Sequence, residues 1–295
     1  MLDLEKSEKL PPEKRYFNIS VIWIFYFRLV IRLLYRWRVP HEAITLLSII
    51  FGLIAAYFFY VGSFFLGAAA IHLKDIFDAC DGAIARLTGK GHLIGRYLDS
   101  LGDFLTLTLT ILAIALYAWN RGQSIYLLWG MVAIVSTFIQ CSFFNYYQLS
   151  YLDIFGIKTL SSRKDEGSRN DLDAGSSSRF GRILLGILRV LYKIVYGWQD
   201  KLVATIDNSM AGNNRQLPPE IRFGNRKLLV LQSALCFGTQ IFVIILFALL
   251  GRPQFSLIFI SVIMNLYLLL VLYLRKRHYS LHRGNFSPVR QATEE

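Results

Sequence analysis

The sequence predicts an all-α integral membrane protein with six transmembrane helices, an N-terminal interfacial helix and a cytoplasmic insertion between the fourth and fifth spans. Apolar residues make up 54% of the 295 residues, and aromatic residues 15%. Several mostly apolar runs reach the roughly 20 residues that a helix needs to cross a bilayer. The formal net charge is +12. Because the Lys and Arg residues lie beside the apolar runs, we attribute this charge to lipid headgroups and to cytoplasmic loops, and expect no nucleic-acid partner.

The N-terminal region is expected to lie outside the hydrocarbon layer. Residues 1–15 are polar and contain proline, which is typical of a tail and lacks the apolar core of a cleavable signal. Residues 16–37 are apolar but carry Arg28, Arg32 and Arg36 at four-residue steps, so one helical face is cationic. We therefore expect an interfacial amphipathic helix here, with a seventh span as the alternative.

The remaining residues, 38–295, are expected to form one membrane domain. The six spans are predicted at residues 41–61, 64–87, 95–119, 123–147, 228–250 and 253–274. Residues 148–227 lose this apolar character and are interpreted as a cytoplasmic insertion with a second interfacial helix near 180–206. If both termini are cytoplasmic, only Arg121 and Arg252 fall in external loops, which agrees with the distribution expected of basic residues.

The second and third predicted spans contain four carboxylates in two pairs. Asp78 and Asp81 are three residues apart, and Asp99 and Asp103 are four apart, so each pair lies on one face of its helix. An antiparallel helical hairpin would bring both pairs together at a similar depth. Four unpaired carboxylates within a membrane would cost on the order of 10 kcal/mol, so the sequence predicts a counter-charge for them.

Divalent metal ions are the counter-charge that this residue set favours. Carboxylate oxygens suit Mg²⁺ or Mn²⁺, whereas zinc prefers thiolate and imidazole ligands. Two ions about 3.5–4 Å apart would fit four carboxylates and are a common arrangement for phosphoryl transfer. Gly82 and Ala85 leave space beside the first pair, and Arg86 offers a guanidinium suited to phosphate. Lys74 is one turn from Asp78 and is expected to form a buried ion pair with it, with acceptor binding as the alternative.

The spacing of these residues resembles the signature of the class I CDP-alcohol phosphotransferases. The pattern reads Asp78-x2-Asp81-Gly82-x2-Ala85-Arg86-x8-Gly95-x3-Asp99-x3-Asp103. The resemblance implies that the four Asp residues bind a pair of divalent metals on the diphosphate and that the last of them is the catalytic general base. It also implies that the Gly, Ala and Arg positions shape the CDP pocket, and that the protein has six membrane helices and forms a homodimer.

Two further positions are compared with the family. Its members commonly carry Pro-Asn-x-x-Thr before the first span, and this chain has Pro40, Glu42 in place of Asn, and Thr45. Thr45 is a candidate nucleotide contact, and an ordinary helix start is the alternative. His92 stands where relatives usually have a Ser or Thr that contacts the diphosphate. A histidine there either donates the same hydrogen bond or is a solvent-facing loop residue.

The resemblance implies a phospholipid-synthesising enzyme that moves a phosphatidyl group from CDP-diacylglycerol to a polar alcohol and releases CMP. The expected location is a bacterial or archaeal cell membrane, with the active site facing the cytoplasm. Serine, inositol or inositol phosphate, and glycerol phosphate all stay open as acceptors. One alternative is a CDP-choline or CDP-ethanolamine enzyme with diacylglycerol as the acceptor. A cation-coupled transporter is the alternative from another class, but the expected discontinuous helices in two related halves are not visible.

Overall fold

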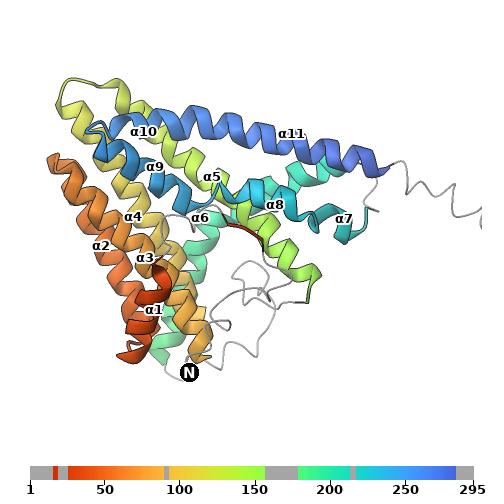
Figure 1. Cartoon of the computed structure of the whole chain (residues 1–295), viewed down its shortest axis with the longest axis horizontal. Coiled ribbons are helices and arrows are strands. Elements are labelled where there is room, and N and C mark those ends of the chain that lie inside the picture. Colours follow the sequence, from red (N-terminus) through yellow and green to blue (C-terminus); the bar gives the residue numbers. More distant parts are fainter. Residues whose placement is uncertain (1–15, 19–25, 90–92, 157–178, 213–216, 284–295) are drawn as a thin grey trace, which may run out of the picture.

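The computed structural model describes residues 16–18, 26–89, 93–156, 179–212 and 217–283, and these residues form helices and no strand. Figure 1 shows a group of long helices packed side by side. Within the described residues, five helical segments are long and apolar enough to cross a membrane, and they are His41–Val61, Leu93–Asn120, Ile125–Ile154, Pro219–Leu249 and Gln254–His282. The chain is therefore all-helical and has the character of a multi-pass membrane protein.

The N-terminal half consists of a short helix and three long ones. These helices are α1 (Phe27–Arg36), α2 (His41–Val61), α3 (Phe64–Thr88) and α4 (Leu93–Asn120). The last three agree closely with the first three predicted spans. Helix α3 packs along both α1 and α2, but its second half is highly charged, and by composition it is not among the five apolar segments. The count of six spans stays a prediction.

Helix α1 is amphipathic in its contacts. Ile31 is fully buried and Leu34 nearly so, and both pack in an apolar cluster with α3. Arg28, Arg32 and Arg36 are exposed on the other side, as the four-residue spacing predicts. The first part of the predicted interfacial helix, residues 19–25, lies outside the described residues. Whether α1 lies at a membrane surface stays a prediction.

Two glycines bring α2 and α4 into close contact. A Cβ atom added at Gly52 of α2 would lie 2.5 Å from Cβ of Thr106, and one added at Gly102 of α4 would lie 2.7 Å from Cδ1 of Ile49. Small residues at membrane-helix interfaces allow the backbones to approach in this way. This packing fixes α4 against α2 on both sides of Asp103, because Gly102 directly precedes Asp103 and Thr106 follows it by three residues.

The C-terminal half is built around α5 (Ile125–Ile154), which runs further than the predicted fourth span. Its other long elements are α9 (Phe237–Leu249) and a continuous run of α10 (Gln254–Ile258), the π-helix η5 (Phe259–Ile263) and α11 (Met264–Arg283). Buried amides join them. Gln140 donates hydrogen bonds to the carbonyl of Ile260, at 3.1 Å, and to Asn265, at 2.8 Å, and it accepts one from Gln240, at 2.9 Å. Gln140 therefore has the helix-to-helix role that is typical of amides within membranes.

The predicted insertion contains one long helix, α6 (Arg179–Ala211), followed by α7 (Pro219–Phe223) and α8 (Arg226–Ser233). Helix α6 includes the whole of the interfacial helix predicted near 180–206, and it packs against α4 and α5 (Figure 1). The hydroxyl of Tyr196 donates a hydrogen bond to the carbonyl of Ser100 at 2.8 Å, and Ser142 donates one to Gln199 at 2.6 Å. The insertion is thus part of the helical body.

A buried carboxylate holds the far end of α6 in place. Asp207 is completely buried and accepts hydrogen bonds from Tyr147 at 2.7 Å, Tyr279 at 2.8 Å and Nε of Arg222 at 2.8 Å. The guanidinium of Arg275 lies 3.5 Å from the centre of the Tyr147 ring. Because the charge of Asp207 is paired and hydrogen-bonded, this network joins α6 to α5, α7 and α11 without leaving an uncompensated charge.

Candidate metal and nucleotide site

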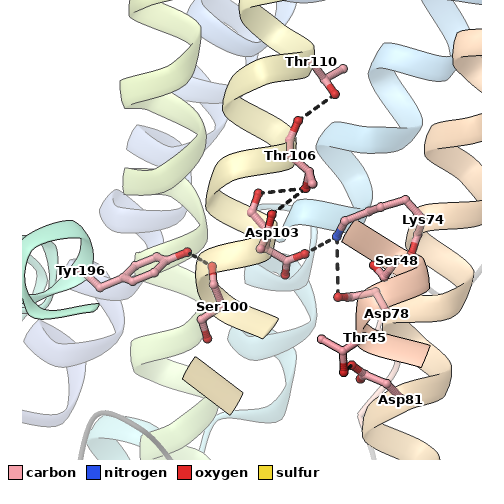
Figure 2. Close-up of polar contacts among 11 residues, drawn as sticks. Thr45, Ser48, Lys74, Asp78, Asp81, Ser100, Asp103, Thr106, Thr110 and Tyr196 are labelled. Atoms are coloured by element: carbon pink, nitrogen blue, oxygen red, sulfur yellow. Dashed lines mark hydrogen bonds and ion pairs between the residues drawn. The ribbon is translucent and has the colours of Figure 1, made fainter. Parts of the chain in front are cut away.

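The four signature carboxylates come from two neighbouring helices. Asp78 and Asp81 lie in the second half of α3, and Asp99 and Asp103 lie in the first half of α4. Asp78 of α3 and Asp103 of α4 face each other across Lys74 (Figure 2). One carboxylate oxygen each from Asp78, Asp99 and Asp103 lies within 4.8 Å of the other two. The structure therefore brings three of the four acids together in a group that can bind a metal ion.

The fourth acid, Asp81, has a partner of its own. Its side chain is buried and accepts a hydrogen bond from Oγ1 of Thr45 at 2.7 Å. Oγ1 of Thr45 also lies 3.1 Å from the carbonyl of His41, one turn earlier in α2. The structure thus places Thr45, a predicted nucleotide contact, directly against a signature acid. This contact fixes the carboxylate of Asp81 relative to α2 (Figure 2).

Lys74 lies inside the acidic cluster. Its ammonium is 3.6 Å from Oδ1 of Asp78, so the predicted ion pair is confirmed. It also forms a hydrogen-bonded ion pair with Oδ1 of Asp103, which the sequence reasoning did not predict. No spacing within one helix reports this contact, because it depends on how α3 and α4 are packed against each other. Lys74 therefore joins the two acid-bearing helices (Figure 2).

Small residues and basic side chains border the acids. A Cβ atom added at Gly82 would lie 3.2 Å from a terminal nitrogen of Arg86, so the absence of a side chain lets the guanidinium fold back along α3. Ala85, which directly precedes Arg86, is half-buried, and Arg86 itself is exposed. A Cβ atom added at Gly95 would lie 3.6 Å from Nε2 of His41. The guanidinium of Arg86 therefore lies over the side of α3 that carries Gly82.

Two features of the surroundings qualify the sequence predictions. His92 lies outside the described residues, so its proposed contact with the diphosphate stays a prediction.

His41 was not singled out from the sequence, yet it is buried beside Gly95, and its Nδ1 lies 3.3 Å from Glu42. The hydroxyls of Thr106 and Thr110 in α4 donate hydrogen bonds to backbone carbonyls one turn earlier, at 2.8 Å each. The hydrogen-bond donors of both side chains are therefore used within the helix.

The donor set of the cluster fits a hard divalent cation. All of its ligands are carboxylate oxygens, which Mg²⁺ and Mn²⁺ prefer. Four carboxylates outnumber the single ammonium of Lys74, so the cluster keeps an excess of negative charge. Asp78 and Asp103 are partly exposed, with 29% and 15% of their side-chain surface accessible, which gives an ion a route to the cluster.

Comparison with known families agrees with this geometry. Residues 38–158 match the family model of the CDP-alcohol phosphatidyltransferases. The match includes α2 to α5 and every residue of the signature, so the resemblance predicted from the spacing is confirmed over these residues. Helices α6 to α11 lie beyond the match. No curated protein matches the chain.

Proposed function

We infer, from the membership of residues 38–158 in the CDP-alcohol phosphatidyltransferase family, that this protein transfers a phosphatidyl group from CDP-diacylglycerol to a polar alcohol and releases CMP. The family itself implies transfer from a CDP-linked alcohol to a second alcohol. The observation that carries the proposal is the convergence of Asp78, Asp99 and Asp103 from two helices of the matched segment. The apolar helices around the cluster suit a donor whose acyl chains stay in the lipid.

The acids are proposed to hold divalent metal, Mg²⁺ or Mn²⁺, against the diphosphate of the donor. Such an ion, when bound, neutralises negative charge on the transferred phosphate and on the departing CMP. Asp78, Asp99 and Asp103 supply the converging oxygens, and Asp81 is oriented by Thr45. Arg86 offers hydrogen-bond donors to phosphate oxygens beside the open face at Gly82.

Asp103 is proposed as the general base. The hydroxyl oxygen of the acceptor attacks the phosphatidyl phosphorus, its proton passes to the carboxylate of Asp103, and the bond from phosphorus to CMP breaks. CMP leaves with the electron pair of that bond. A base must be ionised and fixed in position. The ion pair with Lys74 holds the carboxylate of Asp103 in position.

The proposal includes the finer features predicted from the sequence. Helix α3 is taken as the second of six spans because its 25 residues run alongside α2, which is one of the apolar segments. The protein is expected to form a homodimer, to lie in a bacterial or archaeal cell membrane, and to open its acidic cluster to the cytoplasm. The alternative donor is CDP-choline or CDP-ethanolamine, with diacylglycerol as the acceptor.

The test is CMP release by the purified full chain. We expect CMP when the protein is incubated with CDP-diacylglycerol, Mg²⁺ or Mn²⁺, and one of a panel of alcohols that includes serine, inositol, inositol phosphate and glycerol phosphate. Removal of the metal with EDTA should stop the reaction. Asp103→Asn should lower kcat by about 100-fold or more, as expected for loss of a general base. Release of CMP only from CDP-choline or CDP-ethanolamine with diacylglycerol would select the alternative, and no release from any donor would refute both.

A further inference from the structure

The acidic cluster contains a buried cation, the ammonium of Lys74. Lys74 comes from α3, and only 5% of its side-chain surface is accessible. The hydroxyl of Ser48 in α2 donates a hydrogen bond to the backbone carbonyl of Lys74 at 3.1 Å, which fixes this turn of α3. A buried ammonium is stable only with paired charges, and its pairs here are Asp78 and Asp103. Lys74 is thus held at the closed inner side of the cluster.

Two of the three converging acids are therefore shared between the ammonium and any metal ion. Asp78 and Asp103 each belong to the group whose oxygens lie within 4.8 Å of one another, and each also contacts Lys74. A carboxylate has two oxygens, so each can bind Lys74 with one and an ion with the other. The ammonium of Lys74 lies between Asp78 and Asp103, so these two carboxylates already hold one cation (Figure 2).

We propose that Lys74 is a built-in counter-cation that takes the place of a second metal ion, so that the resting site binds one divalent cation. The inference rests on the proposed function, because it assumes that the acids bind metal. Lys74 repels a divalent ion placed within contact distance of the same two carboxylates, and this repulsion is weakly screened in a buried site. The sequence alone favoured two ions because it did not predict the contact between Lys74 and Asp103.

The test counts bound ions without measuring activity. The full chain, purified in detergent and stripped with EDTA, is titrated with Mn²⁺, and free Mn²⁺ is measured by electron paramagnetic resonance. We expect one Mn²⁺ per chain for the native protein and two for Lys74→Gln, which removes the charge and keeps most of the length. Lys74→Arg is the matched control, because it keeps the charge, and it should bind one. Asp99→Asn should lose the ion in every background.

The outcomes separate this inference from the proposed function. If the native chain binds no Mn²⁺ at the cluster, both fail. If it binds two, the metal site stands and the role of Lys74 is overturned. A count of one in both the native chain and Lys74→Gln also overturns it, because the charge of Lys74 would then not set the number of ions.

Thermal unfolding gives a second readout, which also covers the case in which Lys74→Gln is too unstable to titrate at room temperature. Without its counter-cation, the metal-free cluster should repel itself, so Lys74→Gln and Lys74→Met should unfold at a lower temperature than the native chain in EDTA. Because an ion that binds only the folded state raises the unfolding temperature, saturating Mn²⁺ should raise it more in these variants than in the native chain. An equal rise in the native chain and the variants would contradict the proposal.

Discussion

At the scale of single residues, the hydrogen bond from Thr45 to Asp81 joins α2 to a signature acid of α3. The hydroxyl of Thr45 lies 2.7 Å from Oδ2 of Asp81, and both side chains are buried. A hydrogen bond to a charged group contributes about 1.5–3 kcal/mol, and its loss leaves the carboxylate without a fixed orientation. The position of the signature acid therefore depends on a residue of α2.

We predict that Thr45→Val, which keeps the shape of the side chain, lowers kcat/KM for CMP release by about 10-fold or more. Thr45→Ser keeps the hydroxyl and should retain most of the activity. Both variants should be compared with the native chain in the same detergent, with thermal unfolding as a check on folding. Equal activity of Thr45→Val and Thr45→Ser would show that the contact with Asp81 has no part in the reaction.

The acid residues and the ion pair of Lys74 with Asp78, one turn away on the same helix, could be predicted from the sequence, whereas contacts between helices could not. Spacings of three and four residues place each pair on one helical face whatever the neighbouring helices do. The contacts of Lys74 with Asp103 and of Thr45 with Asp81 depend on how three helices are rotated about their own axes. That rotation is set by packing, including the close approach at Gly52, and no residue spacing within one helix reports it. Sequence therefore predicted the acids of the site and missed the contacts between helices that hold two of them.

At the scale of helices, the contact between α2 and α4 is the tightest constraint on the acidic residues of α4. An added methyl group at Gly52 would meet Cβ of Thr106, a β-branched and stiff side chain. One at Gly102 would meet Cγ1 and Cδ1 of Ile49, which is also β-branched, at 2.7 Å each. Both substitutions to Ala gain helix propensity, so a loss of stability in either variant reports on packing.

We predict that Gly52→Ala and Gly102→Ala each lower the free energy of unfolding by about 1–3 kcal/mol, as is typical of overpacked cores. Gly186→Ala in α6 is the matched control, because an added Cβ there would have no neighbour within 4 Å. The first two substitutions should also lower the rate of CMP release, because α4 carries two of the signature acids. If thermal unfolding in detergent shows Gly52→Ala and Gly102→Ala to be as stable as Gly186→Ala, α2 and α4 are further apart than the structure places them.

The network around Asp207 makes a second prediction at this scale. Nε of Arg222 lies 2.8 Å from Asp207, whose carboxylate is fully buried. Removing one partner of a buried ion pair costs about 3–5 kcal/mol, because the other charge is left unpaired. Asp207→Ala and Arg222→Ala should each destabilise the chain and make the connection between α6 and α7 more sensitive to protease. The double variant should be less destabilised than the sum of the two, which thermal unfolding of the three proteins would measure.

At the scale of the whole molecule, the helices could be predicted well and the docking of the insertion could not. Apolar runs and charged loops predict where spans begin and end, and α2, α3 and α4 follow them closely. The predicted fifth span, 228–250, is divided between α8 and α9, and the helical run predicted at 253–274 continues through α10, η5 and α11 to Arg283. Helix α6 was predicted from an apolar pattern interrupted by basic residues. Such a pattern predicts that the apolar face of the helix is covered, but it does not predict whether lipid or another helix covers it. The structure covers that face with α4 and α5 through residues such as Tyr192 and Tyr196.

The remaining question at this scale is which side of the membrane the acidic cluster faces, and the distribution of charge gives a testable answer. In Figure 1 the turns after α2, α4 and α9 lie near one another, at the end away from the link between α3 and α4. Their only basic residues are Arg121 and Arg252, so we place this end outside the cytoplasm. The native cysteines, Cys80, Cys141 and Cys236, are all buried and give little background in labelling.

We therefore predict that a membrane-impermeant maleimide labels Gln123→Cys and Arg252→Cys on intact cells, because both positions are exposed in these turns. Thr88→Cys and Arg277→Cys, exposed at the other end, should react only after the cells are permeabilised. The unmodified chain should stay unlabelled in intact cells. The reverse pattern would place the acids and Lys74 on the outer side of the membrane, away from the cytoplasmic supply of CDP-linked lipid. It would contradict the predicted orientation and, with it, the lipid-synthesising role.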